Sequence, residues 1–131
     1  MPERFKKEII DLGFVDAQDK YDAYAAAELL CQPSKHESFS LVIMESWLNE
    51  RPVIVSAECE VTKNFAVETN GGLYFSNYAE FEGSVNYIFD HPDVARQMGL
   101  NGKKYVLEHF SWNVIVRAYT EYFEKLAERS N

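Results

Sequence analysis

The sequence has little cysteine, no excess of basic charge and no long apolar run. Its 131 residues include two cysteines, Cys31 and Cys59, too few for a disulfide framework in a chain of this size. We therefore expect reduced thiols and an intracellular protein. The 13 lysines and arginines are outnumbered by 21 aspartates and glutamates, giving a formal net charge of −8. This balance disfavours a partner nucleic acid or an anionic membrane surface, because both select basic faces.

The sequence also lacks any segment typical of membrane insertion or export. No apolar run is long enough to span a bilayer, and the N-terminus "MPERFKKEII" has no signal-peptide core. We expect a cytoplasmic protein, either free or peripheral to the inner face of the membrane. Hydrophobic residues make up 47% of the chain, which is typical of a globular domain with its own core. The sequence shows no second domain, so residues 1–131 are interpreted as one unit.

The order of apolar runs predicts strands that alternate with helices. The strands are expected at residues 6–15, 28–33, 52–56 and 73–75. Helices are expected after Asp16 as N-cap, in residues 39–50, and in three segments of the C-terminal half, of which the second opens at Pro92 and the third at Ser111. The polar residues 57–70 are expected to be irregular, with one helical turn. This order predicts an α/β fold, a Rossmann-like parallel sheet with flanking helices.

The predicted sheet is small for its class. A complete doubly wound domain has five or six strands, whereas four are predicted here, and the first begins almost at residue 1. We therefore expect an incomplete domain whose preceding sequence is missing from this chain.

The segment "PSKHESFSLVIMES", residues 33–46, carries the main functional hypothesis. It places Glu37 and Glu45 eight positions apart, in the loop and helix that follow a strand. Ligands of open α/β sheets bind beyond the carboxyl ends of the strands. Free backbone N–H groups of Phe39, Ser40 and Leu41 at a helix start suit phosphate, while carboxylates accept hydrogen bonds from sugar and ribose hydroxyls. The alternative is that both glutamates are solvated charges in an acidic chain.

Five stretches in order resemble a known family: "LGFV", "PSKHESFSLVIMES", "RPVIVS", "NGGLYF" and "HFSW". Together they resemble the C-terminal half of the group 1 retaining glycosyltransferases with the GT-B fold, from about Leu12 to Leu126. The resemblance implies that residues 1–131 are a partial C-terminal nucleotide-sugar-binding domain. It implies transfer of a sugar from a nucleotide-diphosphate-sugar to an acceptor hydroxyl, with retention, in bacterial polysaccharide or glycolipid synthesis.

The resemblance also implies roles for individual residues. Glu37 would contact the donor sugar as the catalytic carboxylate, Glu45 the ribose, and the amides of Phe39–Leu41 the diphosphate. Ser38 and Ser40 stand where the family usually has glycine, so their hydroxyls would either help to bind phosphate or crowd it. No metal or other cofactor is expected.

The implied partners are a nucleotide-sugar donor, a glycan or lipid-linked acceptor, and the missing N-terminal domain of the same enzyme. Without that domain we expect this chain to be inactive. The tyrosine-rich final helix is expected to pack in the core. Alternatively it is a docking face for the missing domain, whose absence would favour self-association.

Other functions are less well supported by the sequence. "HESFS" is not the zinc motif H-E-x-x-H, because Ser40 stands at the second histidine position, and no G-x-S-x-G elbow is present. The main alternative is a non-catalytic flavodoxin-like or receiver-like interaction module. A receiver needs a phosphoacceptor aspartate at the end of a later strand, and neither "QPS" nor "IVSAE" supplies one.

Overall fold

The centre of the structure is a three-stranded parallel sheet, as the computed structural model of residues 8–129 shows. The strands are β1 (Leu30–Gln32), β2 (Val53–Ser56) and β3 (Gly72–Phe75), with β2 between the other two. Their register places Val53 opposite Leu30 on one side and Gly72 on the other. Because all strands are parallel, their carboxyl ends meet at one edge of the sheet. The predicted α/β fold class is confirmed.

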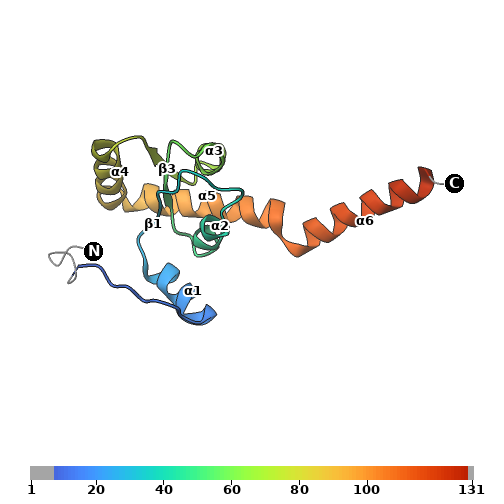
Figure 1. The fold of residues 1–131 in the computed structure, drawn as a ribbon, viewed down its shortest axis with the longest axis horizontal. Coiled ribbons are helices and arrows are strands. Elements are labelled where there is room, and N and C mark those ends of the chain that lie inside the picture. The colour runs from blue at the N-terminus through green and yellow to red at the C-terminus, as the bar shows by residue number, and fades with distance from the viewer. Residues whose placement is uncertain (1–7, 130–131) are drawn as a thin grey trace.

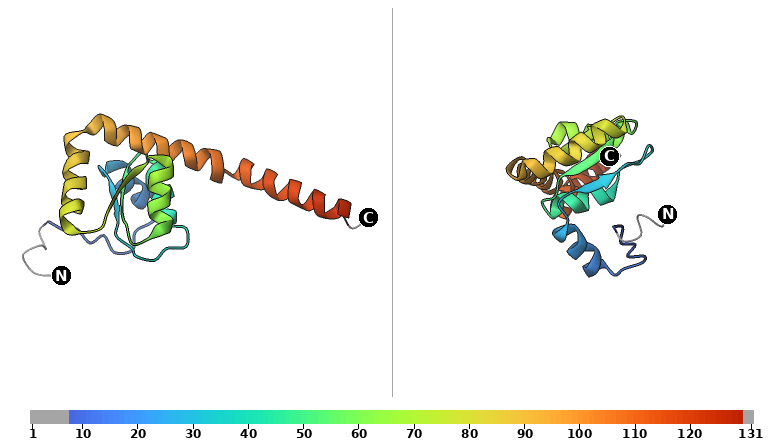
Figure 2. Two further views of the ribbon diagram at one scale, coloured as in Figure 1. Left: turned by 90° about the horizontal axis from the view of Figure 1, so that it is seen from above. Right: turned by 90° about the vertical axis from the view of Figure 1, so that its left-hand side faces the viewer.

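Six helices of the described chain surround and extend this sheet (Figure 1). They are α1 (Ala17–Ala26), α2 (Leu41–Leu48), α3 (Glu60–Thr69), α4 (Tyr78–Asp90), α5 (Pro92–Phe110) and α6 (Trp112–Arg129). The Asp16 side chain accepts a hydrogen bond from the Asp19 N–H and so caps α1 as predicted. Pro92 occupies the first turn of α5, also as predicted. Two orthogonal views show α4 and α5 meeting at a corner beside the sheet (Figure 2).

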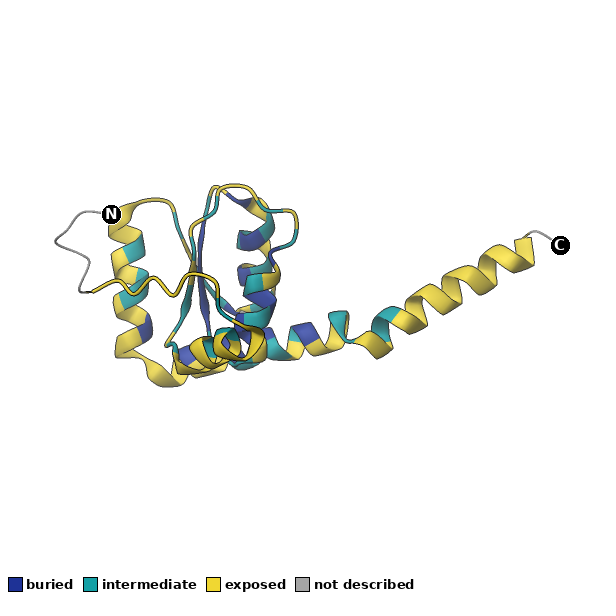
Figure 3. Cartoon of the chain, turned by 60° about the horizontal axis from the view of Figure 1, so that its bottom comes forward, coloured by how far each residue is buried: buried dark blue, intermediate teal, exposed yellow. Residues whose placement is uncertain are grey.

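The core forms on both faces of β2, whose four residues are all buried (Figure 3). On one face, Val53 and Val55 pack with Trp47 of α2 and with residues of α3 and α5. On the other face, Ile54 packs with Ile88 of α4 and with the start of α5. Successive side chains of a strand point to opposite faces, so the continuous apolar run of β2 fits a strand that helices cover on both sides.

The contact between α2 and α5 depends on small residues in α5. The Trp47 side chain is fully buried, and its Nε1 donates a hydrogen bond of 2.9 Å to the Gly71 carbonyl oxygen. A Cβ atom on Gly102 would overlap the Trp47 ring, and one on Gly99 would overlap the Glu50 backbone. Glycine at these positions therefore lets α5 lie directly against α2, and this packing fixes the direction of α2.

Two predictions of local structure are wrong. Residues 8–15 form no strand: they are irregular and mostly exposed, while Lys6 and Lys7 lie outside the described residues. A strand needs a hydrogen-bonding neighbour, and the described residues supply none for this segment. Residues 57–70 contain a ten-residue helix, α3, instead of a single turn. Thr62 and Ala66 of α3 are buried, so packing stabilises a helix that its polar sequence only weakly favours.

The C-terminal helix does not join the core, contrary to expectation. No residue of α6 is buried, and the helix extends away from the body beyond the end of α5 (Figures 1 and 3). Its exposed large apolar residues are Trp112, Val116, Tyr119, Tyr122, Phe123 and Leu126. The predicted stripe is amphipathic, and most of its large apolar residues stay exposed in the described structure. In the described part of the chain, no helix combines the length and hydropathy needed to cross a membrane.

Candidate functional site

Two loops meet at the carboxyl edge of the sheet. One connects β1 to α2 and the other connects β2 to α3, and a salt bridge of 2.9 Å between Lys35 Nζ and Glu58 Oε2 joins them. Between the loops lies an open depression of about 610 Å³. Its lining residues are Lys35, His36, Glu37, Ser38, Glu58, Cys59, Glu60 and Val61. The predicted loop segment therefore borders a concave surface at the position where α/β folds bind ligands.

Glu37 lies in this depression and is held by the end of β1. Gln32 Nε2 donates a hydrogen bond of 2.8 Å to Glu37 Oε1. Glu37 is half-buried and lines the depression, and Oε2 is the oxygen that Gln32 does not contact. Since a carboxylate is an acceptor group, this oxygen suits a hydroxyl donor.

Phe39 anchors the start of α2 to the core. Its ring makes edge contacts with Phe65 and Phe110, with centroid distances of 5.6 and 5.0 Å. The side chain therefore points into the protein, which leaves the backbone of Phe39 as the part that a ligand could contact. Leu41, the first residue of α2, is exposed, and so is Ser38.

Ser40 is the N-cap of α2 and has a left-handed backbone, with φ 67° and ψ 77°. Glycine adopts this conformation without strain, whereas serine does so at a cost. The residue is 7% exposed, and its hydroxyl has no hydrogen-bond partner among the described residues. A buried hydroxyl without a partner at a helix start is a group that a bound anion would satisfy.

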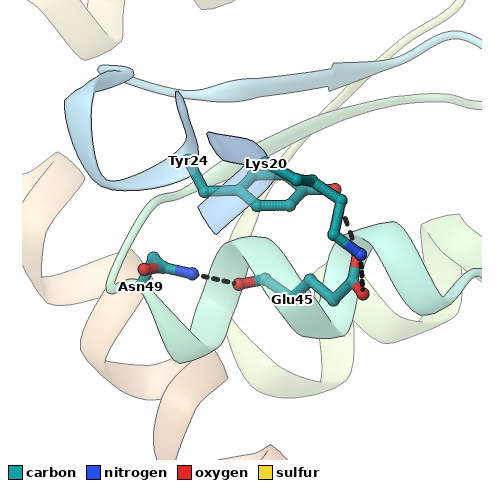
Figure 4. Close-up of polar contacts among 4 residues, drawn as sticks. All are labelled: Lys20, Tyr24, Glu45 and Asn49. Atoms are coloured by element: carbon teal, nitrogen blue, oxygen red, sulfur yellow. Dashed lines mark hydrogen bonds and ion pairs between the residues drawn. The ribbon is translucent and has the colours of Figure 1, made fainter. Parts of the chain in front are cut away.

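Glu45 lies in α2 and is contacted from α1 (Figure 4). Lys20 Nζ donates to Glu45 Oε1 at 2.7 Å, and the Tyr24 hydroxyl donates to Oε2 at 3.2 Å. The hydrogen bond to Glu45 raises the pKa of Lys20. Burial, together with the Glu45 charge, raises the pKa of Tyr24 to about 12. Both groups therefore stay protonated, and remain donors to Glu45, at neutral pH.

Cys59 forms a second contact between the two loops, which the sequence analysis did not predict. It is the buried N-cap of α3. Burial acts to raise the pKa of its thiol, but hydrogen bonds from Thr62 and from backbone N–H groups, that of Glu37 among them, lower the pKa overall. This contact brings the Glu37 backbone against the start of α3.

The structure thus places the predicted residues along one continuous loop and helix. Glu37 precedes α2 and Glu45 lies in its second turn, so the two carboxylates do not share one uninterrupted helix. Sequence reasoning missed Gln32, Lys20 and Tyr24. The four-residue spacing of Lys20 and Tyr24 indicates a shared helix face, but no local signal identifies Glu45 as their common partner.

Residues 3–105 match the family described as glycosyl transferases group 1. The match covers most of the chain, and the chain belongs to this family, as its motifs predicted. Among similar proteins is an uncharacterized glycosyltransferase of Methanocaldococcus jannaschii, 26% identical over 86% of this chain and 29% of that protein. Another is a trehalose synthase of Thermococcus litoralis, 27% identical over 92% of this chain and 28% of that protein.

A third relative is an MMP alpha-(1->4)-mannosyltransferase of Mycolicibacterium hassiacum, 25% identical over 80% of this chain and 26% of that protein. Among solved structures, the sucrose-phosphate synthase of Thermosynechococcus elongatus superposes with a TM-score of 0.82. That superposition covers 96% of this chain and 32% of the other, at 24% sequence identity, and supports the shared fold. The chain spans less than a third of the length of these relatives.

The described residues contain no group of three or more histidine, cysteine, aspartate or glutamate side chains that could hold a metal ion. The prediction of a metal-free site stays a prediction.

Proposed function

We propose that this chain is the donor-binding part of a retaining glycosyltransferase, which moves a sugar from a nucleotide-diphosphate-sugar to an acceptor hydroxyl. One observation carries the proposal: a chain of this family presents Glu37 and the start of α2 at the carboxyl edge of its sheet, with Glu45 following in the second turn of α2. An elongated donor would lie along this segment with its sugar near Glu37 and its nucleoside near Glu45.

Each part of the segment has chemistry suited to one part of the donor. The backbone N–H groups of Phe39–Leu41 and the positive end of the α2 dipole favour the diphosphate. The buried Ser40 hydroxyl adds a donor without another partner in the described structure, and exposed Ser38 lies beside it in the loop. Glu37 would accept hydrogen bonds from sugar hydroxyls, as the catalytic carboxylate that touches the donor.

Two parts of the proposal, the second domain and the acceptor, rest on the family of the chain rather than on the described residues. The greater length of the relatives supports an N-terminal domain that completes the enzyme. We expect the acceptor to be a growing polysaccharide or a lipid-linked glycan, in the cytoplasm or at the inner face of the membrane. Helix ends and basic side chains would stabilise the leaving diphosphate without a metal. The chain alone would be inactive and, with α6 exposed, would tend to self-associate.

The interaction-module alternative has lost its support. The strand ends that a receiver would use carry Gln32 and Ser56, and family membership indicates a transferase.

The test is calorimetric titration of the protein with UDP-, GDP- and ADP-sugars. We expect saturable binding of one donor, weakened about tenfold or more by Glu37→Gln and by Glu45→Gln, since each change removes a charged acceptor. Glu68→Gln, on the exposed side of α3, removes the same charge and should bind like the unaltered protein. Absence of saturable binding, or equal affinity in all three variants, would contradict the proposal. Retention is tested separately, with the full-length enzyme and an acceptor, by NMR of the product's anomeric configuration.

A further inference from the structure

Helix α1 is connected to the rest of the domain mainly by a few polar side-chain contacts, among them those to Glu45. No residue of α1 is buried. The helix lies on α2 through the two hydrogen bonds that Lys20 and Tyr24 donate to Glu45, and through an Arg51 side-chain hydrogen bond to the Ala25 carbonyl oxygen. Polar side chains rather than an apolar face therefore connect this helix to the domain (Figure 4).

Stability alone gives little reason for this arrangement. The Lys20 side chain is 41% exposed and that of Glu45 is 20% exposed. Ion pairs with such exposure contribute about 0–1 kcal/mol. The larger effect of the contact is on geometry, because one donor on each oxygen fixes the torsion of the carboxylate.

The occupied carboxylate keeps acceptor capacity for a ligand. An ionised carboxylate offers about four lone-pair directions, two on each oxygen. Lys20 uses one on Oε1 and Tyr24 uses one on Oε2, which leaves one acceptor direction on each oxygen. Two adjacent hydroxyls on one ring, such as those of ribose, match a pair of acceptors held in this way.

We propose that Lys20 and Tyr24 are positioning residues, which orient the Glu45 carboxylate so that it accepts hydrogen bonds from the 2′- and 3′-hydroxyls of the donor's ribose. This inference rests on the proposed function and adds to it a source of selectivity for ribonucleotides over deoxyribonucleotides. Lys20 holds Oε1 of the carboxylate and Tyr24 holds Oε2, so that together they limit its rotation.

The experiment measures the affinity of the protein for a nucleoside diphosphate and for its 2′-deoxy analogue. UDP, GDP and ADP are titrated by calorimetry, and the tightest binder is compared with its deoxy form. We expect the ribonucleotide to bind about tenfold more tightly, because a hydrogen bond to a charged group is lost with the hydroxyl. In Lys20→Met and Tyr24→Phe the ratio of the two affinities, ribonucleotide over deoxyribonucleotide, should fall to about threefold or less. Lys20→Arg keeps a cationic donor and should preserve the ratio.

Matched controls separate positioning from general effects. Lys104→Met removes the same charge from an exposed site on α5, and Tyr78→Phe removes a hydroxyl from an exposed tyrosine on α4. Both should keep the wild-type ratio. A merely structural role for Lys20 and Tyr24 would weaken both nucleotides equally and leave the ratio unchanged.

The outcomes distinguish this inference from the proposed function. If the unaltered protein binds no nucleoside diphosphate, the proposed function fails and this inference with it. If it binds both forms equally, or if the ratio persists in Lys20→Met and Tyr24→Phe, donor binding stands and the positioning role is wrong. Tighter ribonucleotide binding by Lys20→Met would also overturn it, because Lys20 would then compete with the ribose.

Discussion

Gln32 donates a hydrogen bond from Nε2 to Glu37 Oε1 at 2.8 Å, across the loop that leaves β1. Gln32 is the last residue of its strand, so the rigid sheet rather than the loop determines where the carboxylate lies. A site held by the end of a strand is more accurately positioned than one held by a loop alone.

We predict that Gln32→Met weakens nucleotide-sugar binding about threefold to tenfold, because Glu37 loses the hydrogen bond that orients it. The affinity for the nucleoside diphosphate alone should stay the same, since that part of the donor lies near Glu45. Calorimetry with both ligands checks this. Gln97→Met, which removes an exposed side-chain hydrogen bond on α5, serves as the control. Equal weakening of both ligands would show that Gln32 supports the fold rather than Glu37.

Ser40→Gly should stabilise the protein by about 1 kcal/mol. The left-handed backbone at φ 67° is strained for serine, and the change also removes a buried hydroxyl that has no partner in the described structure. Urea unfolding measures the difference in the free energy of unfolding. Ser38→Gly, at an exposed position without a positive φ, should be neutral or destabilising by about 0.5 kcal/mol. A less stable Ser40→Gly protein would refute the strain argument.

Gly102→Ala should destabilise the protein by about 2 kcal/mol or more. The added methyl group would overlap the buried Trp47 ring and force α5 away from α2. Thermal unfolding is the measurement. Gly83 lies in α4, where an added Cβ would meet no atom within 4 Å, so Gly83→Ala should raise stability by about 0.5–1 kcal/mol through helix propensity. The prediction is contradicted if the two substitutions change the melting temperature in the same direction.

Alkaline pH should lower the free energy of unfolding, in part through deprotonation of Tyr24. Burial and the Glu45 charge raise its pKa from 10.0 to about 12, so the folded state binds this proton more tightly than the unfolded state. The resulting stability is fully present below pH 10 and is lost as the pH rises toward 12. Lys20, whose pKa is also raised, acts in the same direction. Urea unfolding between pH 8 and 11.5 should show a smaller loss of stability in Tyr24→Phe, and an equal loss would exclude Tyr24 as a cause.

The sequence predicted those elements well whose signals are local. The apolar run of β2, the Asp16 cap and the proline that opens α5 all act within a few residues, and each was confirmed. The motif containing Glu37 and Glu45 was found from the order of such signals. Its roles in donor binding remain predictions.

Predictions failed where the outcome depends on a partner surface. Residues 8–15 have an apolar pattern but no neighbouring strand in the described structure, and α3 is a full helix because the sheet buries one of its faces. The amphipathic pattern of α6 was recognised, but the pattern does not say whether another surface covers it.

The sequence by itself determined the α/β class, the strand buried on both faces, the Asp16 cap and the family, because periodicity and backbone preferences are properties of short segments. The tertiary structure alone decided that Lys20 and Tyr24 meet Glu45, that Gln32 holds Glu37, and that Ser40 takes a left-handed backbone with a buried hydroxyl. All three features depend on how α1, α2 and the sheet pack together. Lys20 and Tyr24 lie 25 and 21 positions from Glu45, so the local sequence carries no record of their contact with it.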